Sequence, residues 1–303
     1  MPAAAAHLLK TGFCTVFQAI PTTPEEGAMR RYATLCVFVV ATAGFCDSAV
    51  TAENWLQFKF DSRHSGNVPG RDIETPLGLV SAVPLTDAVF TSPVVVDGKV
   101  YVLDGAGVLF CLDVKTWKVD WRFESRGQPG NCNNVSSPAV IGRYIHFGTT
   151  AGSYYVLDRQ TGQVVNEIRC GEPIFSAAVV SGDRAYFATL GAKVYAVQPD
   201  GTICWTWDFV REVLGFFGDR WNGQDWLKFK KGRVTWRDHF VCSRNIAAYR
   251  VPAAGDGTPA SGEARTGRNT RGSGPVRTVV VIPAGGRTVF LEDAGDRPAV
   301  RAV

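Results

Sequence analysis

The sequence predicts an all-β fold built from repeated four-stranded antiparallel sheets. Three observations support this prediction: short apolar runs, tight turns between them, and recurrence of the whole pattern. The runs are rich in Val, Tyr, Leu and Phe, which suit the pleated, half-buried surface of a sheet. The chain has 303 residues, with 32 glycines and only 2 methionines, which fits a protein rich in turns.

The clearest unit spans residues 92–123, with the sequence SPVVVDGKVYVLDGAGVLFCLDVKTWKVDWRF. We expect four strands here, at Val94–Val96, Lys99–Leu103, Val108–Leu112 and Val119–Phe123. Asp97-Gly98 favours a hairpin between the first two strands, because Asp and Gly accept the positive φ of a type I′ turn. A single sheet of this size leaves two apolar faces uncovered, so it needs neighbours.

The same pattern recurs at residues 137–169 and 176–207. The opening residues Ser92, Ser137 and Ser176 are 45 and then 39 residues apart. The closing residues Leu112, Leu157 and Val197 are 45 and then 40 apart. A period of roughly 40–45 residues with four strands per unit is typical of β-propeller blades. We therefore predict a β-propeller whose ring is incomplete, with about three to five recognisable blades. A sandwich or barrel with evenly spaced hairpins is the alternative.

The ends of the blades carry a family resemblance. Residues 112–121 read LDVKTWKVDW and residues 157–166 read LDRQTGQVVN. This pattern resembles the repeat of the pyrroloquinoline-quinone-type propellers, which include quinone-dependent dehydrogenases and the propeller lipoprotein of outer-membrane protein assembly. Trp117 replaces the usual Gly in the first copy, and Asn166 stands where Trp is expected in the second. The resemblance covers residues 54–249 and, less closely, 279–296.

The resemblance implies that a Trp at the end of each blade docks against the next blade, where a large flat ring covers apolar surface. The candidate inter-blade docking residues are Trp121, Trp205, Asp113, Asp158, Thr161 and Gly162. Asp113 and Asp158 recur at one blade position, so we expect turn carboxylates that cap backbone N–H groups rather than an acid/base pair.

The remaining sequence divides by composition. Residues 1–28 are an N-terminal extension without a fold prediction, and residues 29–52 have the pattern of a signal peptide. There Arg30-Arg31 precedes an apolar stretch too short to span a membrane, and small residues lead to a cleavage site at Ala52. We therefore expect a periplasmic or extracellular protein without a stable membrane span.

Beyond the third copy, the blade region continues to residue 249, so that blades occupy residues 53–249. Residues 208–249 are either a variant blade or an insertion rich in aromatic side chains. Residues 250–278 contain no aromatic side chain and predict a low-complexity linker or disordered segment. Residues 279–303 predict the start of a further blade that the chain does not complete.

Motifs for catalysis or metal binding are missing from the sequence. It contains no G-x-S-x-G, H-E-x-x-H, P-loop or C-x-x-C pattern. The enzymes of the resembled family hold quinone and calcium in a central channel beside two adjacent cysteines, and no Cys-Cys pair occurs here. The net charge of +4 is mild, and the basic and aromatic residues of 226–240 fit a sheet with one solvated face better than a nucleic-acid surface.

These observations predict an exported propeller that acts as a binding module, with no catalytic activity and no cofactor of its own. The expected partner is a protein or a surface ligand, and nucleic acid is not expected. Two alternatives remain open. One is a fragment of a quinone-dependent dehydrogenase, with pyrroloquinoline quinone and calcium as cofactors, and the other is a cell-envelope protein-assembly factor.

Overall fold

The computed structural model describes residues 54–68, 70, 75–126, 131–220, 224–231, 241–252 and 276–303. All of them belong to the second of two compact units, Val50–Val303. The predicted extension (1–28), the predicted signal peptide (29–52) and residues 253–275 of the predicted linker lie outside the described residues. Within the described part, no helix has the length and apolar character needed to cross a membrane.

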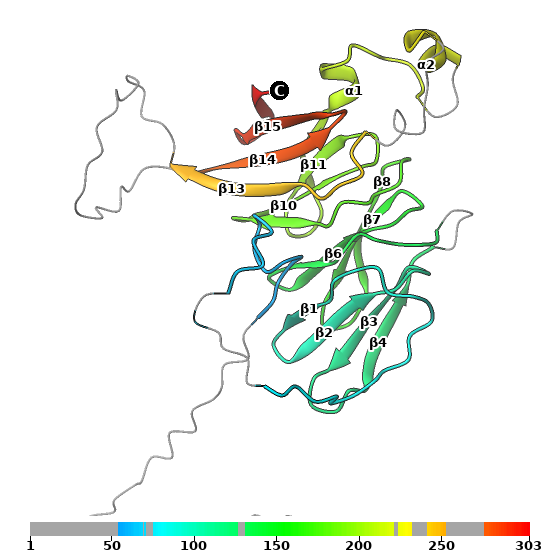
Figure 1. Ribbon diagram of the computed structural model, residues 1–303, viewed down its shortest axis with the longest axis vertical. Coiled ribbons are helices and arrows are strands. Elements are labelled where there is room, and N and C mark those ends of the chain that lie inside the picture. The colour runs from blue at the N-terminus through cyan, green and yellow to red at the C-terminus, as the bar shows by residue number, and fades with distance from the viewer. Residues whose placement is uncertain are drawn as a thin grey trace, which may run out of the picture. The chain divides into compact units, whose positions relative to one another are not determined.

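Four antiparallel sheets of four strands each form the described β-structure (Figure 1). The first comprises β1 (Val94–Val96), β2 (Lys99–Leu103), β3 (Val108–Asp113) and β4 (Val119–Glu124). The second comprises β5 (Ala139–Ile141), β6 (Tyr144–Gly148), β7 (Ser153–Asp158) and β8 (Val164–Arg169). The third comprises β9 (Val179–Ser181), β10 (Arg184–Ala188), β11 (Lys193–Val197) and β12 (Ile203–Asp208). Each sheet is a meander in which consecutive strands pair, which confirms the predicted all-β fold of four-stranded blades.

The fourth sheet corrects the prediction for the end of the chain. It consists of β13 (Ala247–Pro252), β14 (Val276–Ala284), β15 (Arg287–Asp293) and β16 (Pro298–Ala302). This blade has all four strands, and residues 279–303 are its second to fourth strands rather than the start of an unfinished blade. The predicted linker is also shorter than 250–278, because residues 250–252 and 276–278 pair with each other as β-strands.

In its described residues, the segment between the third and fourth sheets forms two short helices and no strand before β13, which fits the insertion alternative. Its described part contains α1 (Phe209–Glu212) and α2 (Gln224–Phe229). Asp208 caps α1, since its Oδ1 accepts the N–H groups of the next turn at 3.0 and 3.2 Å. Phe209, Phe216 and Trp226 are buried in the core that the third and fourth sheets share.

A lead-in segment, residues 55–62, borders the first strand of all four sheets. Its hydrogen bonds, each 2.7–3.1 Å long, join Trp55 to Val95 in β1, Leu56 to Val140 in β5, Gln57 to Val180 in β9, and Ser62 to Ala248 in β13. The first strand of a meander is an edge strand with unpaired backbone groups, and the lead-in segment satisfies some of these groups. The four sheets are therefore arranged around one common segment.

Apolar side chains fill the spaces between successive sheets. One cluster joins the first and second sheets through residues such as Leu103 and Phe147, and another joins the second and third through Tyr154 and Phe187. The rings of Tyr154 and Phe187 stack with their centroids 3.6 Å apart. Each sheet thus covers an apolar face of its neighbour, as expected for blades that are too small to stand alone.

Candidate functional site

The contact between the first and second sheets, here called the first joint, contains two of the predicted docking residues. Trp121 on β4 lies against Gly162 in the turn between β7 and β8, and a Cβ added at Gly162 would come within 2.7 Å of the Trp121 ring. Gly162 also has a φ of +71°, which favours glycine. Beside the indole, Tyr101 donates its hydroxyl hydrogen to the backbone oxygen of Arg159 at 3.1 Å.

The contact between the third and fourth sheets, the third joint, places Trp205 in a similar setting. Trp205 is only 4% exposed, and its Nε1–H donates to Oδ1 of Asp293 at 3.1 Å. The hydroxyl of Tyr186 donates to the other oxygen of Asp293 at 2.6 Å, and Arg184 pairs with the same carboxylate at 2.8 Å. Burial and the neighbouring carboxylate raise the pKa of Tyr186, which keeps its hydroxyl a hydrogen-bond donor.

The second joint, between the second and third sheets, uses different residues at the same register. His146 and Asn166 both pair with Val156, as Tyr101 and Trp121 both pair with Cys111 in the first sheet. A Cβ added at Gly201 would lie 3.0 Å from the Cβ of Asn166, so a turn glycine again permits a close approach.

His146 is completely buried at this second joint. Its Nε2 is 2.9 Å from the backbone oxygen of Pro199, so this nitrogen donates, and Nδ1 accepts from the hydroxyl of Tyr154 at 3.2 Å. Burial lowers the pKa of His146 to about 4, so the ring is neutral at neutral pH. Matching the repeats by residue type alone missed this His/Asn pair, because only the strand register relates it to the Tyr/Trp pairs.

The predicted turn carboxylates, Asp113 and Asp158, bond to residues of their own sheets. Asp113 and Asp158 each accept two backbone N–H groups of their own turn at 2.9–3.1 Å. The other oxygen of Asp113 is 2.8 Å from Lys99, and that of Asp158 pairs with Arg143. These cations are the main reason that the pKa of each carboxyl is lowered. Thr161 donates its hydroxyl hydrogen to Asp158 at 3.3 Å, so these three residues shape the turns that the joints use.

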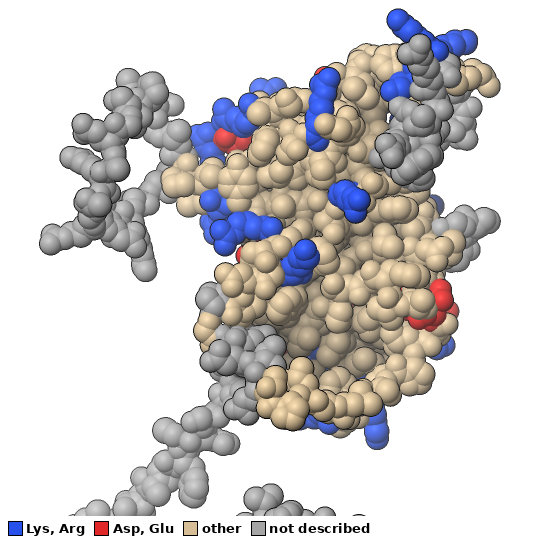
Figure 2. Space-filling model, in the orientation of Figure 1, with Lys and Arg blue, Asp and Glu red and all other residues tan. Residues whose placement is uncertain are grey.

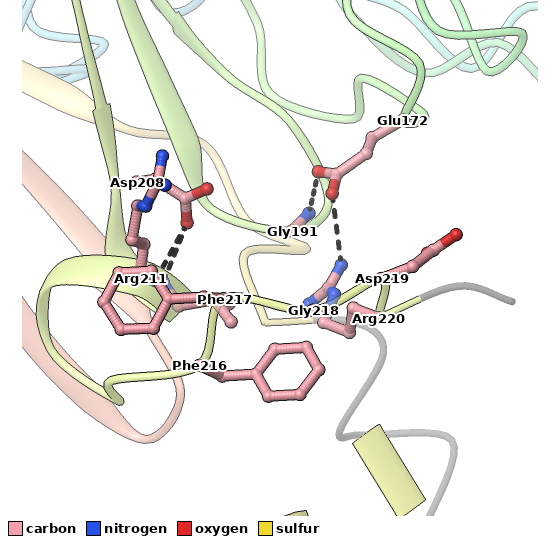
Figure 3. A pocket seen from close by; sticks show the side chains of 10 residues that line it. Glu172, Gly191, Asp208, Arg211, Phe216, Phe217, Gly218, Asp219 and Arg220 are labelled. Atoms are coloured by element: carbon pink, nitrogen blue, oxygen red, sulfur yellow. Dashed lines mark hydrogen bonds and ion pairs between the residues drawn. The ribbon is translucent and has the colours of Figure 1, made fainter. Parts of the chain in front are cut away.

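A separate pocket of about 240 Å³ lies where the aromatic insertion meets loops of the second and third sheets (Figure 3). Glu172 reaches into it from the connection between β8 and β9, and its Oε2 accepts from Thr189 at 2.6 Å and from the N–H of Gly191 at 3.1 Å. Its Oε1 lies 3.9 Å from Arg220 of the insertion. A Cβ at Gly191 would come 2.2 Å from the Glu172 carboxylate, so glycine permits this arrangement.

The floor and the rim of this pocket differ in character. The side chain of Arg220 is 4% exposed, and burial lowers its pKa, while the charges of Glu172 and Asp208 act in the opposite direction. At the rim, Phe217 is 73% exposed, and the guanidinium of Arg211 lies 5.2 Å from the centre of its ring. A buried guanidinium paired with a partly exposed carboxylate, beside an exposed ring and a second guanidinium, can hold a ligand that has both polar and apolar parts.

The described residues include no group of three or more His, Cys, Asp or Glu side chains that could hold a metal ion. The polar side chains of Ser136 and Ser176, just before β5 and β9, donate to backbone oxygens. Ser136 donates to the oxygen of Ser176 at 2.8 Å, and Ser176 donates to the oxygen of Ala188 at 3.0 Å. Calcium takes six to eight oxygen ligands, commonly carboxylates, so we derive no step through quinone or calcium.

Basic side chains do not form a continuous track on the face shown in Figure 2. Lys and Arg stand there in separate groups between larger areas of other residues. A nucleic-acid surface concentrates such charge in one patch or stripe. The expectation that the partner is not a nucleic acid stays a prediction.

The repeated meander sheets and the joints between them define a protein built from β-propeller blades. Residues 80–174 match a family model of quinone-type repeats described as outer membrane protein assembly factor BamB. Residues 80–174 thus match the repeat that the sequence resembles. The match covers all strands of the first two sheets and less than half of the chain.

Solved structures similar to this chain include two dehydrogenases and BamB. A quinohemoprotein alcohol dehydrogenase from Comamonas testosteroni is 14% identical, with a TM-score of 0.48 over 84% of this chain and 41% of that chain. A europium-containing methanol dehydrogenase is 17% identical, with a TM-score of 0.45 over 50% of this chain and 31% of that one. BamB from Moraxella catarrhalis is 20% identical, with a TM-score of 0.37 over 42% of each chain.

This chain therefore spans less than half the length of each of these proteins. A search of curated proteins found no match. The fold assignment accordingly rests on the sheets, the strand register and the joints themselves.

Proposed function

We propose that this chain is an exported binding module and that the Glu172–Arg220 pocket holds a segment of a protein ligand. The observation that carries the proposal is the outward position of Phe217. Its neighbour Phe216 is buried against Trp226, whereas Phe217 is 73% exposed and contacts Arg211 at the rim of a pocket. Packing of the insertion accounts for Phe216 and leaves Phe217 available to a partner.

The composition of the rim supports a protein ligand. Aromatic side chains and arginine are enriched at protein interfaces, and they supply most of the residues whose loss weakens binding strongly. The pocket also lies in connections between strands, where binding residues are commonly held on a rigid scaffold. The aromatic insertion would therefore add a binding surface to a repeat whose sheets supply rigidity.

A peptide selection tests this function. Peptides would be selected from a random library on the full chain, and their affinities measured by fluorescence polarisation. We expect Phe217→Ala to weaken binding at least about tenfold, the loss typical of an aromatic side chain on which binding depends strongly. Phe90→Ala is the matched control, because Phe90 is also exposed, at 53%, but does not line the pocket. Equal affinities for the two variants would refute the assignment of the pocket.

Export is the second part of the proposal, and it rests on the signal-peptide pattern of residues 29–52. Expression of the full chain in a bacterial host, followed by mass spectrometry of the mature protein, would test it. We expect the N-terminus to begin at Glu53 in the periplasmic or secreted fraction. An uncleaved chain found only in the cytoplasm would contradict export and would leave the pocket hypothesis standing.

A cell-envelope assembly factor is a second candidate, favoured by the description of the family that residues 80–174 match. In this case the partner is another envelope protein. A photo-reactive phenylalanine analogue at position 217 would crosslink such a partner in intact cells, and the same analogue at Phe90 is the control. Adducts with envelope proteins from position 217 alone would support this role. Equal or no adducts at both positions would count against it.

A further inference from the structure

A second pocket, here called the Arg126–Arg169 pocket, lies at one end of the first joint and has a volume of about 270 Å³. Arg169 is the last residue of β8, and Arg126 follows the end of β4 in the preceding sheet. The turn between β6 and β7 lines the same pocket with Ala151 and Gly152, whose side chains are small or absent. Both sheets therefore contribute to one site at the edge where β4 and β8 end.

This pocket and the Glu172–Arg220 pocket occupy equivalent places in successive joints. Cys170, which follows β8, donates its backbone N–H at 2.8 Å to the residue just before β7. Phe209, which follows β12, donates in the same way at 3.2 Å to the residue just before β11. Arg169 therefore corresponds to Asp208, and each of them lines the pocket of its own joint.

The connection between β8 and β9 separates the two pockets. Gly171 lines the Arg126–Arg169 pocket, and the next residue, Glu172, lines the other. Packed sheets lie about 10 Å apart, and an extended chain covers about 3.3 Å per residue. About three residues of an extended ligand therefore lead from one pocket to the next, so a single protein segment can reach both.

The two pockets carry opposite charge. The lining of the Glu172–Arg220 pocket has three carboxylates, from Glu172, Asp208 and Asp219, and two guanidiniums. The lining of the Arg126–Arg169 pocket has two guanidiniums and one carboxylate, that of Glu167, so its excess charge is positive. Residues 127–130, directly after Arg126, contain no charged side chain. An acidic group of a ligand therefore favours the Arg126–Arg169 pocket.

The two guanidiniums remain open to a ligand although Glu167 is close to both. The Oε1 of Glu167 already accepts from Ser153 at 3.1 Å and from Tyr155 at 3.4 Å. Its ion pairs with Arg126 and Arg169 measure 3.2 and 3.5 Å, and the structure shows no hydrogen bond from either guanidinium to a described residue. The two arginine side chains are 61% and 68% exposed. Each guanidinium has five N–H donors, so most of them are available to a second carboxylate.

We propose that the protein ligand carries an acidic side chain, Asp or Glu, that binds in the Arg126–Arg169 pocket. This inference rests on the proposed function, because the same ligand segment contacts Phe217. The acidic residue lies about three residues from the residue that meets Phe217. Together the two pockets select an extended segment with a fixed spacing between an apolar and an acidic side chain.

The sequences of selected peptides provide the first test. A random peptide library would be selected in parallel on the full chain, on the double variant Arg126→Gln/Arg169→Gln, and on Arg122→Gln. Arg122 is the matched control because it is 57% exposed and lies 3.2 Å from a carboxylate, as Arg126 does, but does not line the pocket. We expect Asp or Glu at a fixed spacing from an apolar residue in peptides selected on the full chain and on Arg122→Gln. Peptides selected on the double variant should lack this preference.

A double-mutant cycle measures the contact itself. The best peptide selected on the full chain would be compared with its amide form, in which Asn replaces Asp or Gln replaces Glu, by fluorescence polarisation. The acidic form should bind the unmodified chain at least about fivefold more tightly, because two partly exposed charge pairs contribute. This ratio should fall to about one in the double variant and stay unchanged in Arg122→Gln. All three arginines are more than half exposed, so equal urea midpoints would show that the variants have folded.

Three results would overturn this inference alone. They are the absence of an acidic preference in peptides selected on the full chain, an acid-to-amide ratio that the double variant leaves unchanged, and an equal loss in Arg122→Gln. In each case, binding that still depends on Phe217 would leave the proposed function standing. Binding that depends on the two arginines but not on Phe217 would refute the proposed function, and with it the segment that joins the pockets. A library without any binder to the full chain would count against both.

Discussion

Replacing Gly162 with alanine tests whether the first joint contributes to stability. The structure gives two separate costs for this change. Gly162 has a φ of +71°, and a Cβ at this position would approach the ring of Trp121 to 2.7 Å. The ring belongs to β4 of the preceding sheet, so this second cost exists only if the sheets dock as described.

The expected loss follows from these two costs. A non-glycine residue in the left-handed region costs about 1–2 kcal/mol. Inserting a carbon into a packed contact typically costs about 1–3 kcal/mol. Alanine also lowers the conformational entropy of the unfolded chain, which stabilises the folded chain by about 0.4–1 kcal/mol. We therefore expect Gly162→Ala to lower the free energy of unfolding by about 2–4 kcal/mol.

Gly142→Ala is the matched control. Gly142 is in the turn between β5 and β6 of the second sheet with a φ of +58°, and nothing lies within 4 Å of an added Cβ. Its variant should lose only the conformational term, about 1 kcal/mol. Urea unfolding followed by far-ultraviolet circular dichroism measures both, because this signal does not depend on Trp121.

The double variant separates strain from contact. In a Trp121→Ala background the added methyl has no ring to meet, so Gly162→Ala should cost about as much as Gly142→Ala. Equal losses at the two glycines in the parent chain, or a Gly162 loss that is unchanged without the ring, would refute the proposed docking of Trp121.

Four further predictions concern the other joints, the lead-in segment and the cofactor alternative. The pKa of His146 is about 4 in the folded chain against an ordinary 6.5, so the unfolded chain binds the proton first as the pH falls. The free energy of unfolding should therefore fall by about 3 kcal/mol between pH 6.5 and pH 4. In His146→Gln, the urea midpoint should change less with pH across this window. Asp293→Ala should cost about 3–5 kcal/mol because it leaves Arg184 without its buried counter-charge, whereas Asp183→Ala, at an exposed site, should change the urea midpoint little. Gln57→Ala should speed hydrogen exchange of the Val180 N–H, which its side chain accepts at 2.8 Å, and unchanged protection would contradict the role of the lead-in segment. Added pyrroloquinoline quinone and calcium should wash out on dialysis, and retained absorbance with dye reduction by alcohols would support the dehydrogenase alternative instead.

The first three blades could be predicted closely from the sequence because their signals are local. Asp97-Gly98 specifies a hairpin whatever lies around it, and the strands predicted beside it, at Val94–Val96 and Lys99–Leu103, match those of the structure. The third strand extends only one residue beyond its predicted end, to Asp113. Strand bounds in these sheets therefore depend on turn chemistry and alternation within a few residues.

The fourth blade could not be predicted in the same way because its first hairpin is not local. Its first strand, β13, pairs with β14 across residues 253–275, and the Val-rich run at 279–282 then takes the second position rather than the first. Sequence order suggested that this run opens a blade. Pairing with Ala247–Pro252, a strand with little apolar periodicity of its own, decides otherwise.

The Glu172–Arg220 pocket depends on tertiary contacts that no repeat pattern contains. Asp208 ends β12 and caps α1, so the insertion begins directly after the third sheet. Residues of the insertion then line the pocket together with Glu172. The aromatic content of the insertion was visible in the sequence, but neither the exposure of Phe217 nor the pairing of Glu172 with Arg220 follows from composition. Both require knowing which loops of the second and third sheets the insertion covers.

The turn of the first sheet shows why glycine occurs where it does in the joints. Trp117 corresponds to Gly162. Each donates its backbone N–H to the backbone oxygen of the Asp four residues earlier at 2.8 Å, and each has a positive φ. The face of the first sheet on this side packs against Val83 and Leu85, not against a docking Trp. Backbone geometry alone therefore does not demand glycine at this position. At Gly162 the close approach of Trp121 disfavours any side chain, and at Gly201 the close approach of Asn166 does the same.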